Sequence, residues 1–232
     1  MAIPLYLAMT AAELVGKVDL PENIGWMACH FSPYSTGLTN LPRHLPKGSL
    51  LILNDRTPVH GHDPIQIAGV LEETAQRLMC SGLLLDFQRP NCSESQKIAA
   101  ALVQLPFPVA VSDQYAQAFD CAVFVSAPPL HKSLSEHLAP WQGREIWLEA
   151  ALGGEIATIT DAGTDFAPLP PGELPDCPHA DKKLHCQYCI SLYPEQARFL
   201  LRRTRENLDA LLKEAESLGV KQAVGLYQEL GR

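Results

Sequence analysis

The chain has 232 residues, of which 47% are hydrophobic and 19% are charged, a balance typical of a folded globular protein. Its formal net charge of -8 argues against binding to nucleic acid or to an anionic membrane surface, both of which require a basic face. No apolar run reaches the roughly 20 residues of a membrane span, and no Lys or Arg precedes Lys17 as in a secretory leader. The seven cysteines are scattered and do not suggest a disulfide framework, so a cytoplasmic protein is expected. The length predicts a single domain over residues 1–232.

Short apolar segments predict strands in the first part of the chain. Residues 25–31 and 49–55 each run from apolar to polar side chains, and the continuous apolar stretch of the second suits a parallel strand covered on both faces. A helix is predicted to begin after Asp63, which is a good N-cap followed by Pro64, and to end at Ser81 and Gly82. Residues 83–87 are then predicted to form the next strand.

The same alternation continues to the C-terminal end. Further strands are predicted over residues 109–111, 122–125, 145–150 and 220–226, and helices over 93–103, 114–119, 130–138 and 194–218. Strands that alternate with helices imply a parallel sheet with right-handed crossovers. The strand count favours an α/β fold of the (β/α)8 (TIM) type, compact, with its closure left open because the first crossover, residues 32–48, lacks a visible helix. An open doubly wound sheet is the alternative. Such a sheet normally has a glycine-rich phosphate-binding turn after an early strand, and the sequence contains no such turn.

Two features interrupt the alternation near residues 150–183. The Leu-Gly-Gly-Glu sequence at 152–155 predicts a hairpin between strands 146–152 and 156–160. Residues 161–183 contain five prolines and predict a long loop at the rim of the barrel, because loops of this length are uncommon unless they serve a function.

In a (β/α)8 barrel the functional site lies at the C-terminal ends of the strands. Polar or acidic side chains follow several of the predicted strands, and this recurrence indicates a common site, although residues such as Asp55 and Asp113 also suit helix N-caps. The candidates are His30, Asp55, Asp86, Gln88, Arg89, Asp113, Glu149, Tyr188, Gln228 and Glu229.

Residues 81–88, with the sequence SGLLLDFQ, resemble the strand that carries the DGxDxDxE motif of family-18 chitinase-like glycoside hydrolases. Gly82 matches the glycine and Asp86 the last aspartate, whereas Leu84 replaces an aspartate and Gln88 replaces the general acid. The resemblance implies a barrel that acts on or binds carbohydrate. Because a glutamine cannot exchange a proton as an acid must, the barrel either binds sugar without cleaving it or uses another carboxylate pair.

Asp86, Glu149 and Asp55 are therefore the predicted catalytic residues, in the pairs Asp86 with Glu149 or Asp55 with Glu229, since glycoside hydrolysis needs two carboxyl groups roughly 5 to 10 Å apart. The other candidates are predicted to contact the ligand, which is a carbohydrate or another small molecule. No cofactor and no resident metal are expected. The oligomeric state is left open, and a homo-oligomer is one possibility.

Two other functions compete with this one. The first is a non-catalytic barrel that binds a small molecule or a protein. The second is a metal-dependent enzyme, because residues 177–189 contain three cysteines and two histidines, which are the ligands zinc prefers. If residues 185–191 form a strand, alternation places Cys186 and Cys189 on opposite faces. This favours ordinary buried or rim thiols at Cys177, Cys186 and Cys189 over a zinc site that would also use His179 and His185.

Overall fold

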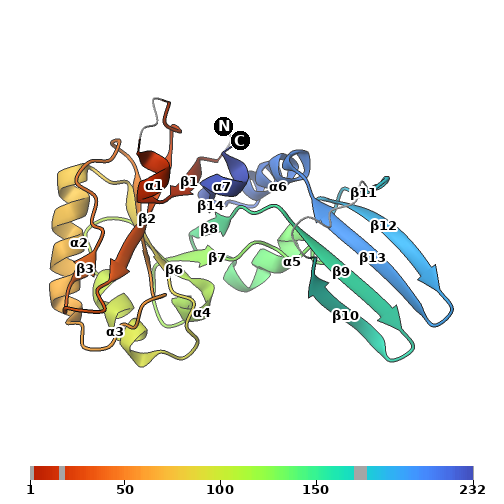
Figure 1. Ribbon diagram of the computed structural model, residues 1–232, viewed down its shortest axis with the longest axis horizontal. Helices are drawn as coiled ribbons and strands as arrows, with labels where there is room; N and C mark the ends of the chain where they lie inside the picture. The colour runs from red at the N-terminus through yellow and green to blue at the C-terminus, as the bar shows by residue number, and fades with distance from the viewer. Residues whose placement is uncertain (1–2, 16–18, 170–176, 232) are drawn as a thin grey trace. The chain divides into compact units, whose positions relative to one another are not determined.

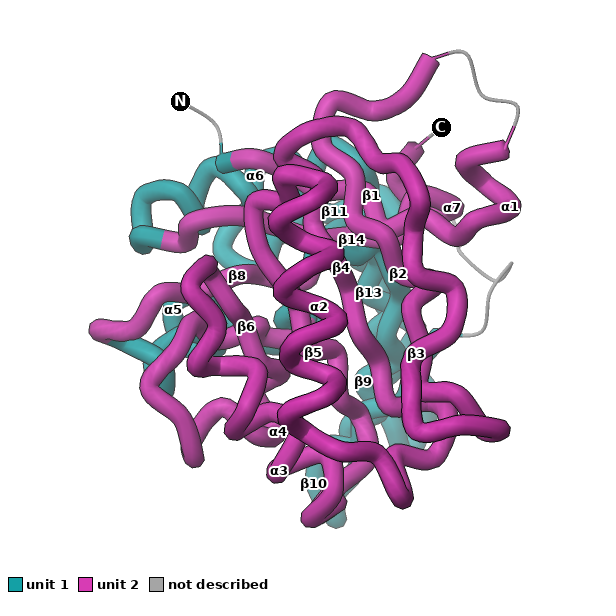
Figure 2. Tube along the Cα trace, turned by 90° about the vertical axis from the view of Figure 1, so that its left-hand side faces the viewer, with its two compact units in different colours: residues 1–3, 127–142, 150–219 teal, residues 4–126, 143–149, 220–232 magenta. Residues whose placement is uncertain are grey.

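The computed structural model describes residues 3–15, 19–169 and 177–231. Its contacts divide the chain into two compact units (Figure 2). The barrel unit comprises residues 4–126, 143–149 and 220–232, and the insert unit comprises residues 1–3, 127–142 and 150–219. A single domain over residues 1–232 stays a prediction. None of the described helices combines the length and the apolar character that crossing a membrane requires.

Eight parallel strands form the barrel unit (Figure 1). They are β1 (Leu5–Met9), β2 (Ile24–Phe31), β4 (Leu50–Asn54), β5 (Gly82–Asp86), β6 (Val109–Ser112), β7 (Ala122–Val125), β8 (Ile146–Glu149) and β14 (Gln222–Leu226). Their order is β1-β14-β8-β7-β6-β5-β4-β2, and parallel pairing of β1 with β2 closes the ring. The predicted (β/α)8-type barrel is confirmed, and it is closed. Strand β1 was not predicted from the sequence.

Helices cover the outside of this barrel. They are α1 (Ala11–Leu14), α2 (Pro64–Leu78), α3 (Ser93–Leu102), α4 (Asp113–Ala116) and α7 (Tyr227–Leu230). As predicted, Asp63 caps α2, its carboxylate accepting a hydrogen bond from the Ile65 backbone N–H at 3.0 Å. The crossover from β2 to β4, residues 32–48, has no helix and contains only the short strand β3 (Leu38–Thr39), antiparallel to β2.

Alternation along the strands divides the apolar residues into two clusters. Ile52 and Leu84 face the inside of the barrel, where they pack with Trp147 and Phe124. Leu51, Leu53, Leu83 and Leu85 face outward and pack against the apolar faces of α2 and α3. Both faces of these strands are therefore covered, which explains the continuous apolar run in each of them.

Gly82, at the start of β5, is a position where no side chain fits. A Cβ atom there would lie 2.9 Å from the Pro108 carbonyl oxygen and 3.0 Å from the Trp147 ring. The Pro108 carbonyl oxygen accepts a hydrogen bond from the Leu83 N–H at 3.0 Å, and the Trp147 ring is only 2% exposed. Neither group can therefore move away freely. The match of Gly82 to the glycine of the chitinase-like motif therefore has a steric reason.

We expect Gly82→Ala to lower the free energy of unfolding by about 1–3 kcal/mol, because it over-packs a dense region of the barrel. Urea denaturation measures this change. Gly69→Ala is the matched control: Gly69 is an exposed position inside α2 with open space around it, so the same substitution should stabilise the protein by roughly 0.5–1 kcal/mol. Equal effects of the two substitutions would contradict the steric argument.

The insert unit contains a five-stranded antiparallel sheet in the order β10-β9-β13-β12-β11. Its strands are β9 (Gly153–Thr160), β10 (Gly163–Pro168), β11 (His179–Asp181), β12 (Cys186–Tyr193) and β13 (Gln196–Arg203). Its helices are α5 (Leu134–Leu138), the 3-10 turn η1 (Ala139–Trp141) and α6 (Arg205–Ser217). Leu130, Ala157, Cys186 and Leu201 form the buried centre of this unit.

Three predictions fail in the insert unit. The hairpin between residues 146–152 and 156–160 is wrong, because β8 pairs in parallel with β7 and β14, while β9 makes its hairpin with β10. Residues 196–203 are a strand although they are rich in helix formers, because pairing with both β9 and β12 outweighs local propensity.

The helix instead begins after Thr204, whose hydroxyl accepts a hydrogen bond from the Asn207 N–H at 3.3 Å. The predicted rim loop, residues 161–183, contains β10 and β11, so it is not a single loop. Its residues 170–176, with three of its five prolines, lie outside the described residues.

Candidate functional site

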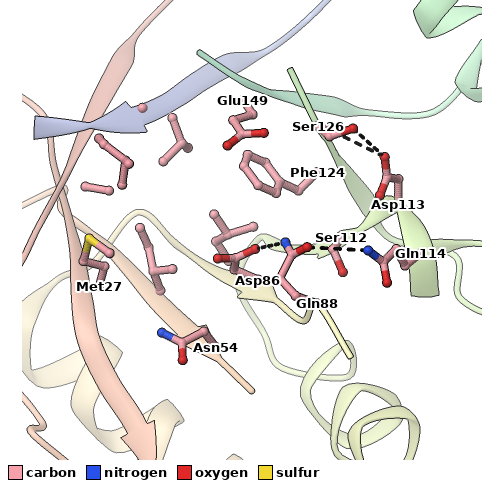
Figure 3. A pocket seen from close by; sticks show the side chains of 16 residues that line it. Met27, Asn54, Asp86, Gln88, Ser112, Asp113, Gln114, Phe124, Ser126 and Glu149 are labelled. Atoms are coloured by element: carbon pink, nitrogen blue, oxygen red, sulfur yellow. Dashed lines mark hydrogen bonds between the residues drawn. The ribbon is translucent and has the colours of Figure 1, made fainter. Parts of the chain in front are cut away.

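A cavity of about 340 Å³ opens at the C-terminal mouth of the barrel (Figure 3). Its floor is apolar and is formed by residues of the barrel interior, among them Met27, Ile52, Leu84, Phe124 and Val224. Its polar lining comes from the ends of successive strands and the residues just after them. These residues are Asn54, Asp86, Gln88, Ser112, Asp113, Gln114, Ser126 and Glu149.

Asp86 and Gln88 form the centre of the polar lining. Gln88 Nε2 donates a hydrogen bond to Asp86 Oδ1 at 2.5 Å, and Gln114 Nε2 donates to Gln88 Oε1 at 3.5 Å (Figure 3). Burial raises the pKa of Asp86, and the nearby Asp55 carboxylate adds to the rise, whereas the bond from Gln88 and the Arg56 charge oppose it.

Two further carboxylates line the same cavity. Glu149 is the last residue of β8 and projects toward the space beside Phe124 (Figure 3). Asp113, at the start of α4, accepts hydrogen bonds through Oδ2 from the Ser126 hydroxyl at 3.2 Å and the Ser126 N–H at 3.4 Å. The structure therefore brings together Asp86, Glu149 and Asp113, three of the residues selected from the sequence.

Asp55 lies behind the cavity, not in it. The residue is 1% exposed, and its two oxygens accept hydrogen bonds from the Gln88 N–H at 2.8 Å, the Arg89 N–H at 3.2 Å and the Ser95 hydroxyl at 3.2 Å. The carboxylate thus fixes the backbone that follows β5 and holds Gln88 at the mouth. The residue next to it, Asn54, lines the cavity instead.

The remaining candidates lie at other places. The His30 ring nitrogen Nδ1 is 3.1 Å from Asn54 Oδ1, so His30 supports a lining residue. Arg89 donates a hydrogen bond from Nη2 to the Arg56 carbonyl at 2.8 Å, and its own carbonyl accepts one from the Tyr115 hydroxyl. Tyr188 lies in β12 of the insert unit. Gln228 and Glu229 lie in α7, outside the cavity lining that the structure describes.

Alternation along the strands could have selected three lining residues that were not chosen as candidates, although two of them, Asn54 and Ser112, stand at the ends of predicted strands. Asn54, Ser112 and Ser126 each lie two positions beyond an inward-facing residue: Ile52, Ala110 and Phe124. Because side chains alternate between the faces of a strand, these polar residues face the interior as well. Gln114 lies in α4, beyond a strand end, and no such signal identifies it.

The proposed zinc ligands do not form a site. Among the described residues, no group of three or more His, Cys, Asp or Glu side chains is arranged to hold a metal ion. His185 Nε2 instead pairs with Glu214 Oε2 at 2.6 Å, and Cys186 lies in the apolar centre of the insert unit.

The chain matches no family model and no curated protein. Solved structures do share its fold. The spore cortex-lytic enzyme SleL of Bacillus cereus superposes with a TM-score of 0.51 at 8% identity, covering 96% of this chain and 70% of that one. The SleL of Bacillus megaterium QM B1551 gives 0.50 at 11% identity, with 96% and 70% covered. A chitinase of Chromobacterium violaceum ATCC 12472 gives 0.49 at 10% identity, with 97% and 93% covered.

The fold is therefore that of SleL-type barrels, and the resemblance to chitinase-like barrels drawn from residues 81–88 is confirmed for the fold. The segment that carries the resemblance is β5, the fourth strand of the barrel in chain order. At these identities the comparison is evidence for the fold alone.

We expect Asp86→Asn to stabilise the protein at pH 7. Burial raises the pKa of Asp86 in the folded state above its value in the unfolded state, which is about 3.9. Between these two pKa values the folded state binds more protons than the unfolded state. The contribution of Asp86 to the free energy of unfolding therefore falls as pH rises through this window. Asparagine removes the buried charge and still accepts the bond from Gln88.

Urea denaturation at several pH values measures this effect. The advantage of Asp86→Asn should shrink as pH falls from the raised folded pKa toward about 3.9, and it should be lost below that value, where the carboxyl is protonated in both states. Asp165→Asn, which removes one negative charge from an exposed position of β10, controls for net charge. An advantage that is the same at pH 3 and pH 7 would rule out the desolvated carboxylate as its source.

Asp55→Ala should lower the free energy of unfolding by about 3 kcal/mol, because it leaves one buried donor, the Ser95 hydroxyl, and two part-buried backbone N–H groups without their acceptor. Asp63→Ala, which removes only a helix cap, should cost about 1 kcal/mol. Thermal or urea unfolding compares the two. If Asp55→Ala were as stable as the wild type, the role of Asp55 in holding the loop after β5 would be wrong.

Proposed function

We propose that the barrel unit binds a carbohydrate at its C-terminal mouth and does not hydrolyse it through position 88. The observation that carries this proposal is the placement of Gln88. Its amide occupies the position of the general acid in the motif that it resembles, lines the cavity and is hydrogen-bonded to Asp86. An amide of this shape preserves hydrogen bonding to a ligand and has no proton to transfer.

The chemistry of the cavity lining supports a neutral, hydroxyl-rich ligand. An aromatic ring, Phe124, and aliphatic side chains form the floor, and carboxylates, amides and serine hydroxyls form the polar lining. No Lys or Arg occurs among the described lining residues, which disfavours a phosphorylated or otherwise anionic ligand. A volume of about 340 Å³ falls at the lower end of the range for small-molecule sites, about 300–1,000 Å³, and suits one or a few sugar units.

The names of the structures with this fold give the choice of sugar to test. They describe spore cortex-lytic enzymes and a chitinase. We therefore propose chitin oligosaccharides and soluble fragments of spore cortex as ligands, with cellulose oligosaccharides as the comparison.

One observation favours a hydrolase as the second candidate. Burial raises the pKa of Asp86, the change that a carboxyl needs to serve as a general acid near neutral pH, and Glu149 lines the same cavity as a second carboxylate. In this alternative Asp86 protonates the leaving oxygen and Glu149 is the base or the nucleophile.

Isothermal titration calorimetry with each oligosaccharide tests the binding. Glu149→Gln should weaken binding by about 10-fold or more, since hydrogen bonds to a charged group contribute roughly 1.5–3 kcal/mol. Glu73→Gln, the same change at an exposed position of α2, should leave affinity unchanged. If none of the oligosaccharides binds at millimolar concentration, the proposed function fails.

Chromatography of the same mixtures after long incubation separates the two candidates. Under the binding proposal the wild type releases no product. Product that disappears in Asp86→Asn would establish the hydrolase instead. Gln88→Glu restores a carboxyl at the position of the missing acid, and product formed by this variant alone would place the scissile bond beside residue 88.

A further inference from the structure

The insert unit contains two cysteine side chains in direct contact. The Sγ atoms of Cys177 and Cys189 are 3.0 Å apart, although the residues are twelve positions apart in the sequence. All seven cysteines of the chain are present as thiols. We propose that Cys177 and Cys189 are an oxidation site, at which an intramolecular disulfide forms and links the open end of the β11–β12 hairpin. This inference is independent of the function proposed for the barrel unit.

Two separate contacts place the Cys177 thiol beside Cys189. Cys177 Sγ lies 3.7 Å from the Leu200 carbonyl oxygen, and Leu200 is the residue of β13 that pairs with Cys189 of β12. Cys177 is only 9% exposed, so its side chain is held by its surroundings. A disulfide has an S–S length of about 2.05 Å, so the two sulfurs need to approach by roughly 1 Å, less than a change of rotamer produces.

Cys186 does not compete for this bond, although it forms a CxxC sequence with Cys189. Residues three apart on a strand point to opposite faces, and Cys186 packs on the apolar side with Leu130, Ala157 and Leu201. Cys186 is completely buried, and this burial raises the pKa of its thiol to about 11. Its thiolate is therefore scarce at neutral pH, and its sulfur faces away from Cys189.

The oxidation is a thiol–disulfide exchange with a low-molecular-weight disulfide, RSSR. The thiolate of Cys189, the more accessible of the two, attacks one sulfur of RSSR, forms a mixed disulfide and releases one RS⁻. The thiolate of Cys177 then attacks the Cys189 sulfur and releases the second RS⁻. The two cysteines lose two electrons and two protons, and RSSR becomes two RSH, so the exchange is balanced.

The bond would strengthen the weakest edge of the sheet. The edge strand β11 pairs with β12 at only three positions, His179–Asp181, and its side chains are mostly exposed. The turn between the strands is held by Asp181, whose Oδ1 accepts hydrogen bonds from the Lys183 and Leu184 N–H groups. The opposite end of the hairpin has Cys177 and Cys189, so a disulfide there closes the hairpin at both ends.

The test is oxidation of the full chain in glutathione buffers that range from fully reduced to fully oxidised. Thiols are counted by maleimide labelling after acid quenching and denaturation, and linked peptides are identified by non-reducing mass spectrometry. The count should fall from seven to five, with Cys177 linked to Cys189. Oxidation should also raise Tm by about 5 to 10 °C, the size expected for a disulfide that closes a short loop in a chain of this length.

Cys186→Ser is the matched control, since it alters the same strand and should leave the linkage and the rise in Tm intact. In Cys189→Ser all six remaining thiols should persist under oxidation, and Tm should not respond. Mapping of the wild-type peptides decides the linkage even if a variant does not fold. The proposal is overturned if all seven thiols persist in the oxidised wild type, if the linkage joins Cys186 or two chains, or if Tm is unchanged after oxidation.

Discussion

Pairing of β1 with β2 is the constraint on which the rest of the barrel unit depends. The other seven neighbouring pairs leave an open twisted sheet, and only this one joins its two edges. Once the ring is closed, every strand has one face toward a shared interior, and every C-terminal end reaches the same mouth. The cavity is the space left where the apolar interior gives way to the polar residues at the strand ends.

Alternation within this closed ring assigns neighbouring residues to different tasks. Asn54 and Asp86 are register partners on β4 and β5, and both face the cavity. Asp55, one residue further, faces the outer layer, where its carboxylate accepts backbone hydrogen bonds from Gln88 and Arg89. The carboxylate of Asp55 thus supports the residues that face the cavity, and the two aspartates belong to one arrangement although only Asp86 lines the cavity.

The sequence predicts the barrel unit well because two local signals agree there. Buried parallel strands such as residues 50–54 are apolar throughout, and helices such as α2 have clear caps, so each element is identified by its own residues. The insert unit lacks this agreement. In β13, Ala197, Leu200 and Leu201 have helical propensity and spacing, and only pairing with β9 and β12 makes them a strand. The strand-end rule selected Asp86 and Glu149, which line the cavity, but it also selected Asp55, which lies behind the cavity, because residue type was weighed without the direction of the side chain.

The support given by Asp55 explains how the mouth keeps its geometry without an acid at position 88. The carboxylate binds the backbone N–H groups of residues 88 and 89, so the path of the chain does not depend on the side chain at residue 88. Glutamine and glutamate have nearly the same shape. The Gln88 amide donates a hydrogen bond to the Asp86 carboxylate, whereas a glutamate at this position could donate one only when it is protonated. The amide therefore removes a like-charge repulsion beside Asp86 while it preserves the lining of the cavity. A change from glutamate to glutamine at this position would therefore remove a group able to transfer a proton and leave the shape of the lining in place.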